Sequence, residues 1–146
     1  MQQRYPIDPE RAKTLTTEQL REHFLVETLF TADAINMVYS HNDRVIVGGV
    51  CPTSPLRLSG DRKALASAVF LARREIGIIN VGGPGKINAA GTDYPMAKQD
   101  GLYIGMGIED VVFESEDANN PARFYFISAP AHTNYPTSHI SMASAE

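Results

Sequence analysis

The sequence predicts an all-β fold, a sandwich or barrel of short strands, with one short helix near the amino terminus. Short runs rich in Val, Ile, Phe and Tyr recur between residues 26 and 128, and Gly, Pro, Asn and Asp separate them. Closely spaced short strands with turns between them are typical of β-sandwiches and barrels. The expected strands are residues 26–31, 35–40, 44–51, 55–59, 67–73, 75–81, 85–89, 102–105, 110–115 and 122–128.

The helix is expected over residues 16–24. Thr16 and Gln19 have the spacing of a capping box, and Leu20 and Phe24 fall on one helix face. Residues 1–15 are expected to form an irregular or extended arm. Residues 138–146 carry no strand or turn signal. We therefore expect one domain over residues 1–137, followed by a linker or the start of a second domain.

Composition excludes several classes of function. The chain has a formal net charge of −4, whereas a general nucleic-acid binder needs a basic face. No apolar stretch approaches the length of a spanning helix, and the polar start of the chain has no apolar signal core. The single cysteine, Cys51, cannot form an internal disulfide, so we expect a reducing, cytoplasmic setting with Cys51 as a small buried hydrophobe.

The glycine-rich segment 81–85 has two possible interpretations. A phosphate-binding loop would end in Lys-Ser or Lys-Thr and lead into a helix, and this segment does neither. We therefore expect a tight turn between Ile79 and Ile87.

Glycine and carboxylate spacings follow the two motifs of metal-binding cupins, although most of the metal ligands are replaced. The first motif, His-x-His followed by Glu and Gly, aligns Glu75 and Gly82, which places Val69 and Leu71 at the histidine positions. The second, Pro-x-Gly-x-x-His, places Asp110 at its histidine. Since aliphatic side chains coordinate no metal, we expect no metal site on this chain. Alternatively, Glu75 is solvated or paired with Arg73 or Arg74, and Asp110 is a turn residue.

Three longer blocks carry a specific resemblance: MVYSHNDRVIVGGV (37–50), FLARREIGIINVGG (70–83) and PAHTNYPT (130–137). They resemble the 5-keto-4-deoxyuronate isomerase family, with weaker similarity joining them over residues ~10–137. The resemblance implies a cupin-like β-barrel (jelly roll) as the amino-terminal half of a tandem of two barrels. It also implies assembly into hexamers and a small sugar-acid substrate from pectin breakdown. That substrate, 5-keto-4-deoxyuronate, is converted to a 2,5-diketo-3-deoxy sugar acid.

The resemblance further implies that zinc is held in the carboxy-terminal barrel by a His-x-His, Glu and His set. This chain has roughly half the family's length and contains no His-x-His; its histidines are His23, His41, His132 and His139. No metal ligand or catalytic residue is therefore carried over. We expect the chain to be inactive alone, with a stand-alone cupin serving in assembly or sugar binding as the alternative.

Several residues could still bind the substrate. Arg suits the two-pronged binding of a carboxylate, which makes Arg44, Arg73 and Arg74 candidates for a clamp. His41 lies beside Arg44 in a run that could instead be a solvated hairpin turn.

His132 and Tyr135 could line a pocket at the rim of the barrel. The prolines at positions 130 and 136 favour another interpretation of this segment, a stiff connector between barrels.

Overall fold

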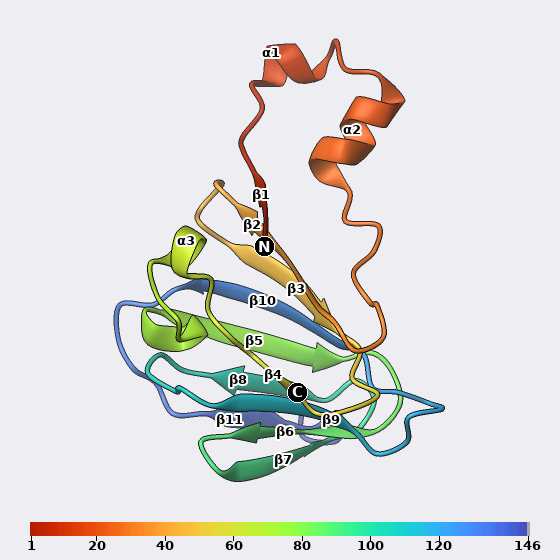
Figure 1. Ribbon diagram of the computed structural model, residues 1–146, viewed down its shortest axis with the longest axis vertical. Coiled ribbons are helices and arrows are strands. Elements are labelled where there is room, and N and C mark those ends of the chain that lie inside the picture. Colours follow the sequence, from red (N-terminus) through yellow and green to blue (C-terminus); the bar gives the residue numbers. More distant parts are fainter. Residues whose placement is uncertain (146) are drawn as a thin grey trace.

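Two β-sheets face each other and enclose the core in this computed structural model, which describes residues 1–145 (Figure 1). The larger sheet has the strand order β1 (Gln2–Arg4), β2 (Ile35–Ser40), β3 (Ile46–Val50), β10 (Phe124–Pro130), β5 (Arg74–Asn80), β8 (Gly101–Ile104) and β11 (Ser138–Ile140). The smaller has β4 (Leu56–Arg57), β9 (Val111–Ser115), β6 (Gly85–Ala89) and β7 (Thr92–Met96). Only the pairing of β1 with β2 is parallel among the described strands.

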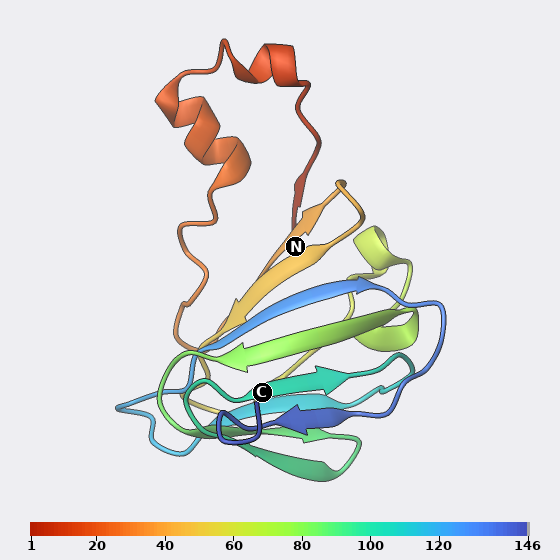
Figure 2. The same cartoon turned by 180° about the vertical axis from the view of Figure 1, so that it is seen from behind.

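Alternating burial explains why these segments form strands. Along β5, β6 and β10 every second side chain is buried, which is the pattern of strands with one face on a core. Phe124 and Phe126 of β10 are fully buried, and the Phe124 ring lies 5.4 Å from that of Phe113 on the opposite sheet. The apolar core therefore fills the space between the two sheets. Figure 2 shows the two sheets from behind.

The expected all-β, cupin-like jelly roll is confirmed. The two sheets stay separate along their edges and do not close into a continuous barrel. The expected turn between Ile79 and Ile87 is also confirmed, and residues 81–84 carry the chain from β5 in the larger sheet to β6 in the smaller. The Asn80 side chain fixes this turn, because it donates to the Gly83 carbonyl at 2.8 Å and accepts from the Gly82 amide at 3.0 Å. Cys51 is buried, as expected.

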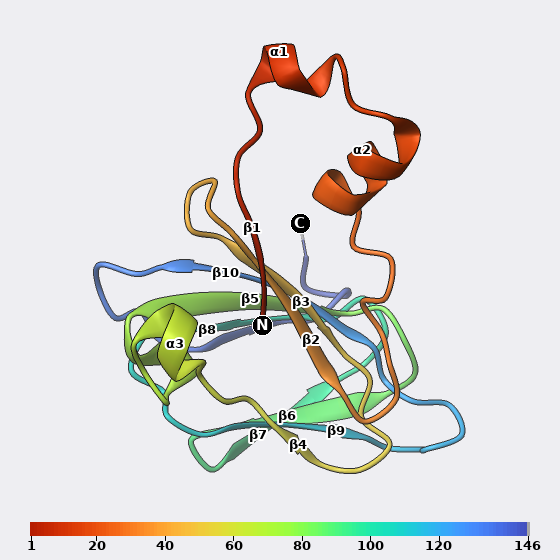
Figure 3. The ribbon, with the colours of Figure 1, turned by 45° about the horizontal axis from the view of Figure 1, so that its top comes forward.

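The helices lie at the margins of the fold. They are α1 (Pro9–Ala12), α2 (Thr17–Phe24), α3 (Arg62–Leu65) and the 3₁₀ turn η1 (Phe70–Ala72). The capping box at Thr16 and Gln19 is confirmed. Neither α1 nor α2 buries a residue, and Figure 3 shows both on an arm that stands away from the sheets. No helix within residues 1–145 is both long and apolar enough to cross a membrane.

Several expectations about elements were wrong. Residues 1–15 were expected to form an irregular or extended arm and instead carry β1 and α1, and α3 and η1 add to the single helix that was expected. Residues 26–31 are not a strand, because the Asn36 amide holds the carbonyls of Thr28 and Leu29 in a loop. Residues 67–73 form a turn and η1, since the Ser67 hydroxyl bonds both the amide and the carbonyl of Val69. Residues 92–96 form β7, which was not expected. Residues 138–140 form β11 and pair with β8, so the larger sheet extends past position 137.

Candidate functional site

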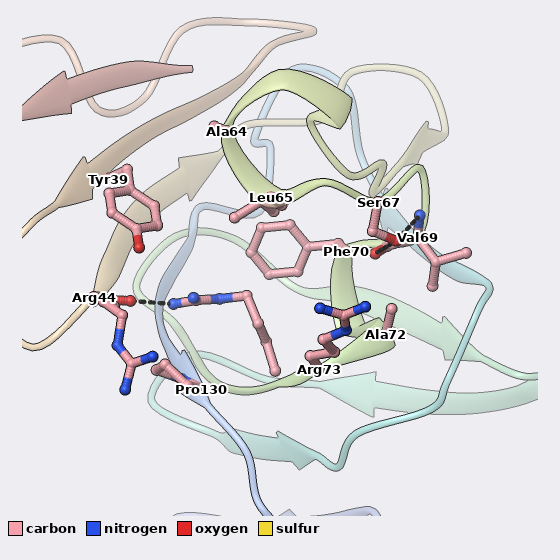
Figure 4. A pocket seen from close by; sticks show the side chains of 11 residues that line it. Tyr39, Arg44, Ala64, Leu65, Ser67, Val69, Phe70, Ala72, Arg73 and Pro130 are labelled. Carbon is pink, nitrogen blue, oxygen red and sulfur yellow. Dashed lines mark hydrogen bonds between the residues drawn. The ribbon is translucent and has the colours of Figure 1, made fainter.

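Arg44, Arg73 and Arg74, the expected clamp residues, line one pocket of ≈ 170 Å³, which we call the arginine pocket. Three segments build it: the end of β2 with the turn that follows, the stretch from α3 to the start of β5, and the end of β10. Figure 4 shows Arg44 and Arg73 arriving from the first two segments, with the rings of Tyr39 and Phe70 nearby. The lining consists of Tyr39, Arg44, Ala64, Leu65, Ser67, Val69, Phe70, Ala72, Arg73, Arg74 and Pro130.

Arg74 is the buried member of the three, with 6% of its surface exposed. As the first residue of β5, it points to the same side as the buried Ile76 and Ile78. Its Nε donates to the Ser128 hydroxyl at 3.1 Å. Its Nη2 donates to the carbonyls of Ser128 at 2.8 Å and Arg44 at 2.6 Å, the latter drawn as a dashed line in Figure 4. Arg74 therefore ties the β2–β3 turn to β10.

The electrostatic setting of Arg74 is unusual because no carboxylate pairs with it among the described residues. Burial lowers the pKa of its guanidinium; Tyr39 opposes this in part, and the positive charge of Arg44 adds a smaller lowering effect. The guanidinium lies 5.8 Å from the centre of the Tyr39 ring, which offers it a cation–π contact. Because no described carboxylate pairs with Arg74 or Arg44, no negative charge neutralises these two neighbouring guanidinium groups.

Arg44 and Arg73 are exposed at the rim of the pocket. Arg44 follows Asp43 in the turn between β2 and β3, and both residues have positive φ angles of 55° and 54°. The hairpin-turn interpretation of this run is therefore confirmed. It is compatible with the clamp interpretation, since the same turn residue lines the arginine pocket.

The other three candidates lie elsewhere. The ring of His41 stacks on Tyr5 at 4.1 Å and its Nε2 lies 3.1 Å from Gln3 Oε1, so it faces the amino-terminal arm. His132 and Tyr135 are exposed in the segment that joins β10 to β11. None of the three lines the arginine pocket.

Tyr39, Phe70 and Ser128 were not expected at the site. The sequence did contain a signal for Tyr39. It lies two residues after Met37 on β2, so both side chains point to the same face of the strand, and both pack against the core. Phe70 was placed on a strand that the structure replaces with η1. The hydroxyl and carbonyl oxygens of Ser128 both accept hydrogen bonds from Arg74. Sequence spacing does not reveal contacts of this kind.

The positions aligned with cupin metal ligands do not come together. Glu75 points to the outer face of β5, opposite to the buried Arg74, so it cannot face the interior of the jelly roll. Leu71 is buried in the core and Asp110 pairs with Arg57 at 2.8 Å. Within residues 1–145 no three His, Cys, Asp or Glu side chains gather in a possible metal site. The described residues therefore do not fit a zinc ion.

Glu75 has a different partner from the arginines considered above. The Tyr103 hydroxyl donates to Glu75 Oε2 at 2.9 Å. Burial, followed by the interaction with Glu75, raises the pKa of Tyr103 to about 12. Tyr103 therefore stays protonated near neutral pH and can keep this bond, which replaces the expected pairing with Arg73 or Arg74.

A second hollow lies on the outer face of the larger sheet, the side turned away from the core. Its volume is ≈ 360 Å³, and its lining is mainly apolar, including Ile79, Tyr103, Tyr125, Ile127 and Ile140. We call it the outer-face groove. None of the described residues that line it carries a charge at neutral pH, which makes the arginine pocket the stronger candidate for binding a charged small molecule.

Comparison with known proteins places this architecture in a family. Residues 24–146 match the KduI/IolB family. A protein of Formosa agariphila named 4-deoxy-L-threo-5-hexosulose-uronate ketol-isomerase is 52% identical over 97% of this chain and 51% of its own length. The proteins of the same name from Halalkalibacterium halodurans and Caldicellulosiruptor bescii are 53% and 47% identical, over 94% and 100% of this chain. The chain spans about half the length of these relatives.

Solved structures share only the fold. A Pseudomonas aeruginosa structural-genomics target described as a glyoxylate-induced protein superposes with a TM-score of 0.50 and 12% identity, covering 70% of this chain and 36% of its own. The cupin domain of Schizosaccharomyces pombe Cnp3 gives a TM-score of 0.49 and 10% identity, over 66% and 60% of the two chains. The family match and the ketol-isomerase relatives instead cover most of the chain at high identity, and the chain therefore belongs to the KduI/IolB family.

Proposed function

We propose that this chain is the amino-terminal barrel of a ketol-isomerase that converts 5-keto-4-deoxyuronate to 3-deoxy-D-glycero-2,5-hexodiulosonate. One observation carries the proposal: relatives bearing the ketol-isomerase name are 47–53% identical to nearly the whole chain. The reaction belongs to the breakdown of pectin and other polyuronates. The single buried cysteine supports a cytoplasmic setting.

The chemistry explains why the chain is expected to need a second half. A ketol isomerase moves a proton between adjacent carbons, which requires a base, an electrophile at the carbonyl oxygen and a clamp for the substrate carboxylate. The described residues do not fit zinc, so the proposed zinc site and base belong to residues outside this chain. In the assembled protein, for which we propose a hexamer, this barrel would contribute structure and charge.

Complementation would test the proposal. The chain alone, with zinc added, should not isomerise 5-keto-4-deoxyuronate in a coupled assay. Joining it to the carboxy-terminal half of the Formosa agariphila relative should restore turnover, because the two proteins are 52% identical over this half. The full-length relative is the positive control. Turnover by the chain alone within tenfold of that control would contradict the assignment of the chemistry to the second half.

Metal content gives a separate check on the same proposal. Elemental analysis of the purified chain should find no stoichiometric zinc, since Glu75 and Asp110 point to different places and have other partners. About one zinc per chain that is lost on Glu75→Ala would contradict this.

A stand-alone cupin for assembly or sugar binding is the second candidate. The outer-face groove favours it, because a large apolar hollow suits contact with another protein surface. Failure of complementation by a well-folded hybrid protein would decide for this alternative.

A further inference from the structure

We propose that the arginine pocket binds the carboxylate of a small organic acid. The inference goes beyond the proposed isomerase activity, because it concerns a site on this half of the protein and depends only on the pocket's own residues.

The first step is the charge of the pocket. Arg44, Arg73 and Arg74 all line it, and no acidic residue does. None of the three forms an ion pair within the described part of the chain. This gathering of positive charge occurs in a chain with a net charge of −4, so general basicity does not explain it. Like charges held close together repel one another unless an anion lies between them.

The second step is the free donor on a buried group. A guanidinium carries five N–H donors, and Nη1 of Arg74 is not one of the fully buried side-chain atoms without a partner, so it is accessible from the pocket. Nε and Nη2 of Arg74 bond to Ser128 and to the Arg44 carbonyl, while Nη1 has no hydrogen-bond partner within residues 1–145. Arg74 is more than nine-tenths buried and lines the pocket. An oxyanion in the pocket would therefore meet a donor that the fold holds in place.

The third step is the shape of the pocket and the rest of its lining, which favour an organic acid over an inorganic anion. Leu65, Val69, Phe70 and Pro130 give the pocket an apolar wall beside the arginines. A volume of ≈ 170 Å³ holds about six waters at roughly 30 Å³ each. This space accommodates a carboxylate with a body of several carbon atoms. It does not accommodate a polymer.

The geometry of arginine favours a carboxylate in particular. A planar guanidinium presents parallel N–H bonds that match the two oxygens of a carboxylate. Arg44 and Arg73 are exposed and can approach an anion from the rim, whereas Arg74 is held rigid beneath them. Affinity should consequently depend on the exposed arginines for charge and on Arg74 for position.

Calorimetric titration of the chain would test the inference, with D-galacturonate as the probe. D-Galactose serves as the uncharged match, butyrate as an acid without a sugar body, and inorganic phosphate as an anion without carbon. We expect saturable binding of galacturonate below about 10 mM, with no binding of galactose and weaker binding of phosphate. Binding of butyrate would indicate a general carboxylate site. Absence of butyrate binding would indicate a site that is specific for sugar acids.

Variants locate the binding. The double variant Arg44→Gln, Arg73→Gln should weaken galacturonate binding by about tenfold or more, because charge-assisted hydrogen bonds are lost. Arg123→Gln removes an exposed arginine outside the pocket and should change nothing. Arg74→Lys keeps the buried charge while removing the fork, and should weaken binding without unfolding the chain. Circular dichroism of each variant checks that it is folded.

Four results would overturn the inference. These are absent binding of galacturonate, equal binding of galactose, phosphate binding at least as tight, and an equal loss in Arg123→Gln. None of these results bears on complementation, so failure of the carboxylate site and failure of the isomerase assignment remain distinguishable.

Discussion

Gly48 and Gly77 both lie in strands of the larger sheet, yet their surroundings are opposite. A Cβ atom at position 48 would overlap the ring of Phe126, which is fully buried. A Cβ atom at position 77 would meet nothing within 4 Å, because it would point to the outer face. Absence of a side chain is therefore needed for packing at one position and not at the other.

We predict opposite effects of alanine at these two glycines. Gly48→Ala should lower the free energy of unfolding by about 1–3 kcal/mol, since a packed core resists an added methyl group. Gly77→Ala should be neutral or stabilising by up to about 1 kcal/mol, because it restricts the unfolded chain. Urea denaturation monitored by circular dichroism measures both. Equal destabilisation by the two substitutions would contradict the packing shown around Phe126.

At the residue scale, the sequence identified the charged residues of the site but not which of them are buried. The three arginines were predicted as candidates from their chemistry, and the structure brings them to one pocket. Counting by twos from the buried Ile76 and Ile78 would also have placed Arg74 inside and Glu75 outside. The cupin spacing gave the opposite expectation for Glu75, because it aligned Glu75 with a metal ligand that faces the interior of the barrel.

Among the elements, α2 combines a complete amino-terminal cap with an absence of buried residues. Phe24 is 61% exposed and Leu20 is 38% exposed, so the apolar face expected from the sequence is present but covers nothing. A helix of this length is only marginally stable without packing. The arm that carries α1 and α2 should consequently be the least stable part of the fold.

Hydrogen exchange can measure this difference between elements. We predict that amides in α2 exchange with little protection, while those in the centres of β5 and β10 exchange only on global unfolding. β10 is the central strand of the larger sheet and pairs with both β3 and β5, so it serves as an internal reference. Protection of α2 equal to that of β10 would contradict the prediction and show that another surface covers the arm.

The predictability of elements depended on their place in a sheet. Interior strands such as β5 and β10 alternate clearly and were predicted close to their observed bounds. The sequence did not predict β7, because it is an edge strand whose residues are mostly exposed. It also includes Pro95, and proline is tolerated in edge strands. The sequence did not predict β11 for a similar reason: all its residues are exposed, and only its pairing with β8 defines it as a strand. Pairing at an edge leaves little trace in composition.

At the scale of the whole molecule, the outer-face groove is the main apolar surface that remains uncovered. Ile79, Ile127 and Ile140 line it and are 46%, 47% and 48% exposed. The contribution of residues 121–135 to this groove is divided. Tyr125 and Ile127 line the groove, whereas Phe124 and Phe126 are in the core.

We predict that two copies of this chain associate through the groove, because exposed apolar patches favour contact with a partner. Light scattering at tens of micromolar should give a mass above that of a monomer. Ile127→Lys should shift the mass towards the monomer by placing a charge in the groove. Val81→Lys is the matched control, since Val81 is 44% exposed and does not line the groove. A monomer mass for the unaltered chain would contradict this prediction.

The sheet edges restrict how such contacts can grow. β1 and β11, at the two edges of the larger sheet, have three residues each, while the smaller sheet ends in the two-residue β4 and the proline-containing β7. Long, unpaired edges recruit further strands and lead to fibrous aggregates, and short or proline-interrupted edges oppose this. Copies of the chain that meet through the groove should thus form closed assemblies of limited size, and the exposed apolar face can be retained without making the protein prone to amyloid-like polymerisation.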